Sequence, residues 1–202
     1  MLFILSGPSG AGKNTLLNEV LKTEKDLVYS VSASTRPPRP HEQEGVHYFF
    51  LGRDEFEGKA RTGAFLEWAE FCGHLYGTPK AFIDEQLAAG KKVILDIDIQ
   101  GARQIRAKMP EAILVFLLPP NLSELSQRLR GRGTEVEEAI ANRLGRARSE
   151  MEAIYDYDYV IINDDLSKAA QRLRAIIAAE GLRRERIDCE ALIRQVMEGI
   201  PK

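Results

Sequence analysis

Apolar and polar positions alternate along the chain in blocks typical of a protein built from buried strands and amphipathic helices. Short apolar runs predict strands at 2–5, 27–32, 46–51, 65–71, 92–97, 113–118 and 159–162. Helical spacing predicts helices that begin near 14 and near 79, and others at 100–108, 121–130, 134–155, 166–179 and 187–197. Near-continuous apolar strands that alternate with helices indicate an α/β fold with a parallel sheet covered by helices on both faces.

Two helix starts before residue 80 carry capping signals. Asp54 to Glu57 shows a capping-box pattern and predicts the opening of a short helix. Thr78 is expected as the N-cap of the following helix, with Pro79 at its first position.

The chain changes character after residue 32. Three prolines between Pro37 and Pro40 exclude a helix there, and the segment that follows is rich in aromatic residues and turns. We therefore expect residues 33–79 to form an inserted lobe and residues 1–32 and 80–182 to form the core. A short lid is expected at about 128–143 and a helical tail at 183–202.

Length and composition bound the class of protein. The 202 residues, 44% of them hydrophobic and 29% charged, describe one ordinary globular domain with room for an insertion. A net charge of −2 gives no reason to expect a nucleic-acid partner. Cys72 and Cys189 are too few for a disulfide framework, and the first apolar run ends at Gly7, too early for a membrane span. We expect a cytoplasmic protein without a membrane partner, and the sequence leaves its oligomeric state open.

A glycine-rich stretch follows the first strand. Its sequence is Gly7-Pro8-Ser9-Gly10-Ala11-Gly12-Lys13, and a helix begins directly after it. Glycines allow backbone N–H groups to converge on an anion, the helix N-terminus faces the same point, and a lysine adds a positive charge. A glycine-rich turn without function is the alternative, but the lysine after the last glycine favours a phosphate-binding loop.

The predicted magnesium site departs from the usual motif at one position. Asp96 ends an apolar strand, where an acidic residue beside Mg²⁺ is expected in such folds, although an Asp there is also a common turn former. The motif has Ser or Thr after the lysine, whereas this chain has Asn14 and then Thr15. Asp96 and Asn14 are the candidate metal ligands.

Arginines gather in two places. Arg36 and Arg39 lie on the proline-rich loop. A second group surrounds the Gly131–Gly133 break, and it consists of Arg128, Arg130, Arg132, Arg143, Arg146 and Arg148. Arg146 and Arg148 fit a solvated helix face, whereas Arg132 between two glycines suits a lid over phosphates. Spacing alone favours the exposed side of a strand for Glu67.

Several stretches together resemble the guanylate kinases over residues 1 to about 182. They are the glycine-rich loop, Ser30–Ser32 with Thr35–Arg39, Phe65–Ala69 with Tyr76–Thr78, Ile94–Gly101, Gly131–Glu135 and Asn163–Asp165. The order and the spacing of these motifs match the family's pattern.

The resemblance implies a role for each matching residue. Residues matching Arg36, Arg39, Tyr48 and Tyr76 hold the GMP phosphate, and residues matching Ser32 and Glu67 recognise guanine. Thr78 and Asp98 match positions that line the same pocket. Arg132 and Arg143 match lid arginines that reach the transferring phosphates, with Arg128 a further candidate. Glu67 is thereby expected in the site rather than on an exposed strand face.

The expected activity is ATP-dependent phosphorylation of GMP or dGMP with Mg²⁺. One alternative is a related ribose-bisphosphate kinase, which shares the phosphate loop but lacks the guanine-recognising residues. The other is a non-catalytic binding module of the same fold that recognises phosphopeptides. An intact phosphate loop argues against that module, and Asn14 is the feature that keeps it open.

Overall fold

The computed structural model describes residues 1–130, 144–145 and 147–198. Five parallel strands form the core sheet in the order β2-β7-β1-β8-β9. These strands are β1 (Leu2–Ser6), β2 (Leu27–Tyr29), β7 (Lys92–Asp96), β8 (Ile113–Leu118) and β9 (Tyr159–Ile162). The predicted α/β fold with a parallel core sheet is confirmed.

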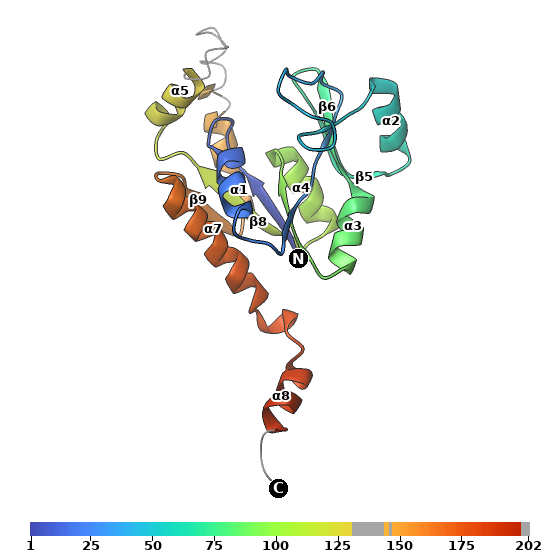
Figure 1. Cartoon of the computed structure of the whole chain (residues 1–202). Coiled ribbons are helices and arrows are strands. Elements are labelled where there is room, and N and C mark those ends of the chain that lie inside the picture. The colour runs from blue at the N-terminus through green and yellow to red at the C-terminus, as the bar shows by residue number, and fades with distance from the viewer. Residues whose placement is uncertain (131–143, 146, 199–202) are drawn as a thin grey trace.

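Helices cover both faces of this sheet (Figure 1). Phe3 and Leu5 of β1 pack into a cluster with α1 (Lys13–Leu21) and α7 (Leu166–Gly181). Leu2 and Ile4 point to the opposite face, because side chains alternate along a strand, and pack with residues of α3 (Lys80–Ala88) and α4 (Ile99–Lys108). The helix α5 (Leu122–Arg130) lies beyond the carboxyl end of β8.

A second sheet lies beside the core and is formed entirely by residues 33–79. Its strand order is β4 (Phe49–Phe50), β3 (Ala33–Ser34), β6 (His74–Pro79) and β5 (Phe65–Phe71). The helix α2 (Arg53–Arg61) packs on it through Phe56, whose ring stacks on Phe65 at 4.4 Å between centroids. Gly77 packs closely at this contact, since a Cβ there would lie 3.0 Å from the Phe56 ring and 3.0 Å from the Trp68 Cβ.

Several predicted strand limits are wrong. The strand expected at 27–32 ends at Tyr29, and the one expected at 46–51 is reduced to Phe49–Phe50. The strand β6 was not predicted, because Gly77 and Pro79 both weigh against a strand.

Both predicted capping signals before residue 80 are also wrong. Pro79 itself occupies the N-cap position of α3, and Thr78 belongs to β6. The helix α2 begins at Arg53 after Gly52, without a side-chain cap. In both cases a helix begins within two residues of the sequence signal, but the expected side-chain cap is absent.

The end of the chain extends away from the core. The first part of the helix expected at 134–155 lies outside the described residues. Residues 144–145 and 147–151 are helical, and a 3₁₀ helix, η1 (Glu152–Asp156), follows. Beyond α7 and the short 3₁₀ helix η2 (Arg184–Arg186), the helix α8 (Cys189–Met197) stands clear of the core in Figure 1, near the predicted 187–197.

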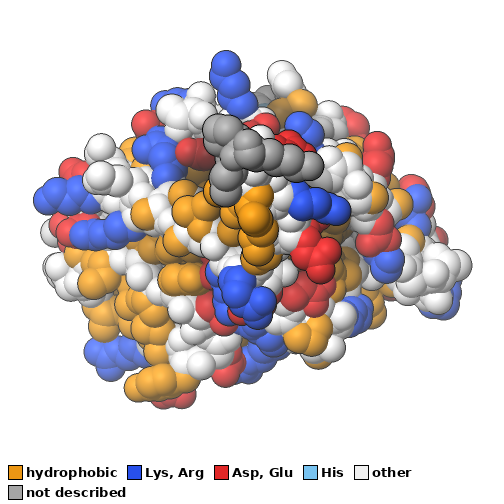
Figure 2. Space-filling model, turned by 90° about the horizontal axis from the view of Figure 1, so that it is seen from below, with side chains coloured by type: hydrophobic (Ala, Val, Ile, Leu, Met, Phe, Trp, Pro, Cys, Tyr) orange, Lys and Arg blue, Asp and Glu red, His pale blue; other side chains and the backbone are white. Residues whose placement is uncertain are grey.

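The distribution of charged side chains is consistent with the small net charge. Figure 2 shows acidic and basic side chains mixed on the face seen from below, with no large patch of basic side chains. Within the described residues, no helix is long and apolar enough to cross a membrane.

Candidate nucleotide-binding site

The glycine-rich loop connects β1 to α1 and has the backbone geometry that its glycines allow. Gly10 and Gly12 have φ of 93° and 96°, in the left-handed region that L side chains rarely adopt. A Cβ on Gly7 would lie 2.2 Å from the Leu117 carbonyl oxygen. The helix α1 has no side-chain cap and no acidic residue in its first turn, so its first N–H groups remain available for an anion.

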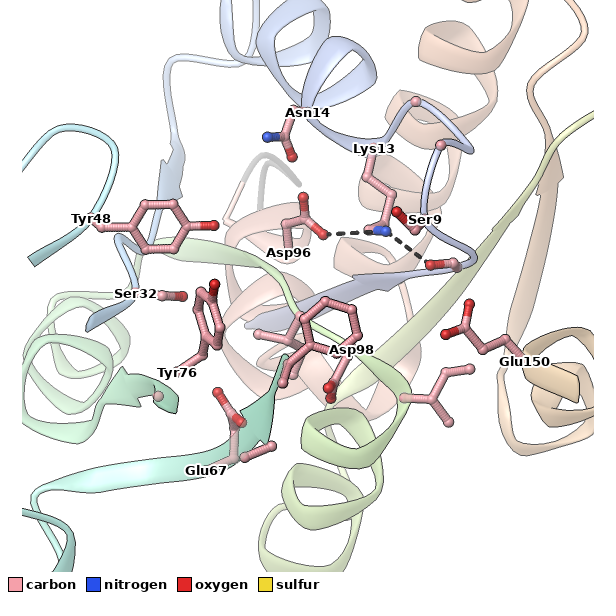
Figure 3. Close-up of a pocket in the computed structure, with 18 of the residues that line it drawn as sticks. Ser9, Lys13, Asn14, Ser32, Tyr48, Glu67, Tyr76, Asp96, Asp98 and Glu150 are labelled. Carbon is pink, nitrogen blue, oxygen red and sulfur yellow. Dashed lines mark hydrogen bonds and ion pairs between the residues drawn. The ribbon is translucent and has the colours of Figure 1, made fainter. Parts of the chain in front are cut away.

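Lys13 and Asp96 face each other at the centre of the site (Figure 3). Lys13 Nζ donates to the Gly7 carbonyl at 2.8 Å and lies 3.9 Å from Asp96 Oδ1. Asp96 ends β7, the neighbour of β1 in the sheet, so parallel pairing brings the carboxylate beside the loop. Burial raises the pKa of Asp96, while the charge of Lys13 opposes this effect.

A second group of contacts fixes the backbone of the glycine-rich loop. Asn163, just after β9, donates from Nδ2 to the Ala11 carbonyl at 2.7 Å. The Arg128 guanidinium donates to the same Ala11 carbonyl at 3.3 Å and to the Asn163 carbonyl at 3.0 Å. Arg128 was expected to contact ATP, and the contacts seen here fix the loop that would do so. Asn163 was assigned no role from the sequence, although its turn was among the matching motifs.

A cavity of about 340 Å³ extends from the phosphate loop to the second sheet. Its lining brings together most of the predicted site residues, namely Gly7, Ser9, Gly10, Gly12, Lys13, Asn14, Thr15, Ser32, Tyr48, Glu67, Tyr76, Asp96 and Asp98. Glu150, on the helical segment 147–151, also lines it and was not predicted. The two predicted halves of the site, for phosphates and for a base, therefore share one cavity.

Glu67 occupies the end of this cavity away from the loop. Glu67 is only 4% exposed, and its Oε1 accepts a hydrogen bond of 2.5 Å from the Thr78 hydroxyl across the β5–β6 pair. Burial raises the pKa of Glu67 to about 7, while the Thr78 hydrogen bond and the charge of Lys108 act in the opposite direction and Asp98 adds to the rise. Thr78 thus contacts the carboxylate instead of capping α3.

The arginines of the proline-rich loop lie at an adjoining cavity of about 310 Å³. Arg36 and Arg39 line it, and Asn14, Tyr48 and Tyr76 line both cavities. The Arg36 guanidinium binds both carboxylate oxygens of Glu42 at 2.9 Å, and this ion pair lowers the pKa of Glu42 to about 2. Glu42 also accepts from the Arg39 backbone N–H at 2.7 Å, a role that the sequence did not suggest.

Four predicted site residues, Pro8, Ala11, Thr78 and Arg128, line neither cavity. Pro8 and Ala11 contribute through their backbones, since the Ala11 N–H donates to the Pro8 carbonyl at 3.0 Å and closes the loop. Arg132 and Arg143 lie outside the described residues.

The oxygen atoms around Lys13 fit a magnesium ion held mainly by nucleotide phosphates. Asp96 and Asn14 both point into the cavity beside the loop (Figure 3). No group of three or more acidic, His or Cys side chains suited to a metal occurs among the described residues. Mg²⁺ keeps several waters and often uses only one or two protein oxygens plus substrate phosphates, so this donor set is sufficient.

The family model of the guanylate kinases matches residues 1–180. The chain belongs to the guanylate kinase family. It is 48% identical over 186 residues to the guanylate kinase of Desulfitobacterium hafniense, covering 92% of this chain and 93% of that protein. The guanylate kinase of Sphingopyxis alaskensis is 49% identical over 203 residues, covering 100% of this chain and 92% of that protein.

A solved structure agrees with these relatives. The crystal structure of guanylate kinase from Anaplasma phagocytophilum superposes with a TM-score of 0.79 at 32% identity, covering 96% of this chain and 94% of that one. As a member of this family, the chain is a kinase that uses ATP to phosphorylate a nucleoside monophosphate.

Proposed function

We propose that this kinase phosphorylates GMP and dGMP, with MgATP as the donor, by direct in-line transfer. The observation that carries the proposal is Glu67, a buried carboxylate at the far end of the cavity that begins at the phosphate loop. An ionised carboxylate accepts hydrogen bonds from both N1–H and N2–H₂ of guanine, whereas adenine has an acceptor at N1 and no amino group at C2. Ser32 lines the same cavity and supplies a hydroxyl for the base.

The transfer requires positioning and charge neutralisation rather than a covalent enzyme intermediate. An oxygen of the acceptor phosphate attacks the γ-phosphorus of ATP while the bond to the β-phosphate oxygen breaks, giving ADP and GDP. Lys13 and the loop N–H groups hold the donor phosphates, and Arg36, Arg39, Tyr48 and Tyr76 hold the acceptor phosphate. Mg²⁺, with Asp96 and Asn14 as its candidate protein ligands, would neutralise charge on the phosphate oxygens. Arg132 and Arg143 are proposed to complete the site from the lid.

The two alternative functions are supported less well. A ribose-bisphosphate kinase binds a substrate without a base, so the fold would not require a buried carboxylate, hydrogen-bonded to Thr78, beside Ser32 in the cavity. A non-catalytic phosphopeptide-binding module does not require the glycine backbone angles and the Lys13–Asp96 arrangement seen at the loop.

An assay of ADP release across acceptors tests the proposal. Wild-type protein with MgATP is compared on GMP, dGMP, AMP, CMP and UMP at equal concentrations. We expect turnover with GMP and dGMP at least about a hundredfold above the other acceptors, because the unmatched bases leave a buried carboxylate without its partners. Equal turnover of AMP and GMP would contradict the proposal, and no turnover of any nucleotide would favour the binding module.

A further inference from the structure

The main chain on both sides of Glu67 is held by one helix of the core. β5 is the edge strand of the second sheet within the described residues, so the backbone groups on its outer side are not paired by another strand there. The side-chain amide of Gln104 pairs with both backbone groups of Trp68, accepting from its N–H at 3.3 Å and donating to its carbonyl at 2.8 Å. Lys108 Nζ donates to the Leu66 carbonyl. The residues before and after Glu67 are therefore both tied to α4.

The carboxylate itself lies against the same helix. A Cβ on Gly101 would lie 2.5 Å from Glu67 Oε2 and 3.0 Å from its Cδ. Gly101 is a helical residue in the first turn of α4, where its N–H donates to Asp98 Oδ1 at 2.8 Å. Its backbone does not require glycine for conformation, since it is not among the positive-φ positions. The missing side chain leaves the space that the Glu67 carboxylate fills.

These three residues share one side of α4. Gly101, Gln104 and Lys108 are separated by three and four positions, the spacing that places side chains on a common helix face. We propose that this face positions the Glu67 carboxylate and thereby sets the selectivity for the base. This inference rests on the proposed guanine specificity. Gly101, Gln104 and Lys108 are positioning residues, because they act through Glu67 rather than through contact with the nucleotide.

Gly101→Ala separates this role from a general effect on folding. Alanine favours a helix more than glycine does, and the nearest obstacle is the end of a flexible side chain, so the protein should fold with an unchanged or higher Tm. The added methyl displaces the Glu67 carboxylate, so KM for GMP should rise about tenfold or more. KM for ATP should stay within about twofold, since the phosphate loop is untouched.

Two further variants test the backbone contacts. Gln104→Leu and Lys108→Met should each raise KM for GMP about three- to tenfold without changing KM for ATP. Lys108→Arg can still donate to the Leu66 carbonyl, so its KM for GMP should lie close to that of the wild-type protein. Arg103→Ala is the matched control, because Arg103 is on the same helix but forms an exposed ion pair with Asp156. That control should leave both KM values unchanged.

A double-mutant cycle shows whether the effect passes through Glu67. If it does, Gly101→Ala combined with Glu67→Gln should lose no more GMP selectivity than Glu67→Gln alone. The losses would instead multiply if Gly101 acted independently, and that result overturns the inference. An unchanged KM for GMP in Gly101→Ala also overturns it while leaving the proposed function intact. Failure of wild-type protein to phosphorylate GMP overturns both.

Discussion

The Thr78 hydroxyl donates a 2.5 Å hydrogen bond to Oε1 of Glu67, and both residues are almost fully removed from solvent. A buried carboxylate is costly unless it is hydrogen-bonded, and in the free protein the Thr78 hydroxyl supplies a hydrogen bond to Oε1. The second oxygen, Oε2, lies toward Gly101, and Glu67 lines the cavity. The arrangement leaves Glu67 with acceptor capacity for a ligand that donates twice from one edge, as guanine does.

Replacing Glu67 by glutamine should lower kcat/KM for GMP roughly ten- to a hundredfold. The substitution keeps the shape but removes the charge and places an NH₂ donor where guanine also donates, a mispairing of about 1–3 kcal/mol. Steady-state kinetics on GMP, with KM for ATP as the internal control, measure this. An unchanged value for GMP would remove Glu67 from the base-binding site.

The raised pKa of Glu67 predicts a pH dependence. The ionised form is required for guanine, so kcat/KM for GMP should fall as the pH drops below about 7, the pKa of Glu67 in the free enzyme. Asp98 and Lys108, the charged groups that act on Glu67, raise and lower this pKa respectively. Because the GMP phosphate also titrates, near pH 6, Glu67→Gln is the control, and it should lose the limb near pH 7. A limb that persists in Glu67→Gln would belong to another group.

The same pKa has a consequence for the stability of the free protein. The folded state binds a proton on Glu67 up to about pH 7, whereas the unfolded chain releases it near 4.5. The free energy of unfolding should therefore decline as the pH rises from about 4.5 to 7 through this group, and Glu67→Gln should remove that part of the decline. Urea unfolding of both proteins across this range measures the difference.

Arg36→Ala and Arg39→Ala should differ in their effect on folding. Both should raise KM for GMP, because both residues line the adjoining cavity of about 310 Å³ and are proposed to hold the acceptor phosphate. The Arg36 guanidinium holds the Glu42 side chain, which is 8% exposed, whereas Arg39 contacts it through its backbone N–H, which alanine keeps. Loss of Arg36 therefore leaves a carboxylate poorly paired and should cost about 1–3 kcal/mol of stability. Thermal unfolding together with GMP kinetics separates the two variants. Equal Tm values would show that the Arg36–Glu42 pair contributes nothing to folding.

The phosphate loop and the core sheet could be predicted from the sequence because their signals are local. The loop is a contiguous motif between a strand and a helix, and the core strands are continuous apolar runs. Glu67 could not be placed by spacing, because its burial depends on α4 packing beside β5, more than thirty residues along the chain. Asn163 was missed for the same reason, since it holds a carbonyl 152 residues earlier in the chain. Contacts of this kind exist only once the sheet order is fixed.

Loss of Asn163 should raise KM for ATP and leave KM for GMP unchanged. Asn163→Ala removes the hydrogen bond to the Ala11 carbonyl and opens space beside Gly12, where a Cβ would lie 2.5 Å from Asn163 Nδ2. The loop loses a buried partner, so KM for ATP should rise severalfold and stability should fall by about 1–2 kcal/mol. Asp164→Ala is the control and should change neither KM. Asp164 follows Asn163 in the same turn, but it forms an exposed ion pair with Arg172. A rise in KM for GMP alone would contradict the assignment.

Asn14 is the position at which the chain departs from the phosphate-loop motif, and it leads to the final prediction. Its amide oxygen is a hard donor like a hydroxyl, but the amide also carries an NH₂ group that can only donate. Thr15 does not replace the missing hydroxyl directly, because the next residue in a helix of about 3.6 residues per turn is rotated by about 100°.

Asn14→Ser should therefore change kcat by less than about tenfold, equivalent to ~1.4 kcal/mol, and should tighten the apparent affinity for Mg²⁺. Mg²⁺ is expected to be held chiefly by ATP phosphates and waters, with Asp96 and Asn14 acting through those waters, so either side chain at position 14 is compatible with transfer. Lys13 still supplies its charge at the loop, 3.9 Å from Asp96 in the free protein. Titration of activity with Mg²⁺ at saturating ATP and GMP measures both quantities. If wild-type protein had no Mg²⁺-dependent activity and Asn14→Ser restored it, the natural chain would be a binding module, because position 14 alone would then decide whether the phosphate loop supports catalysis.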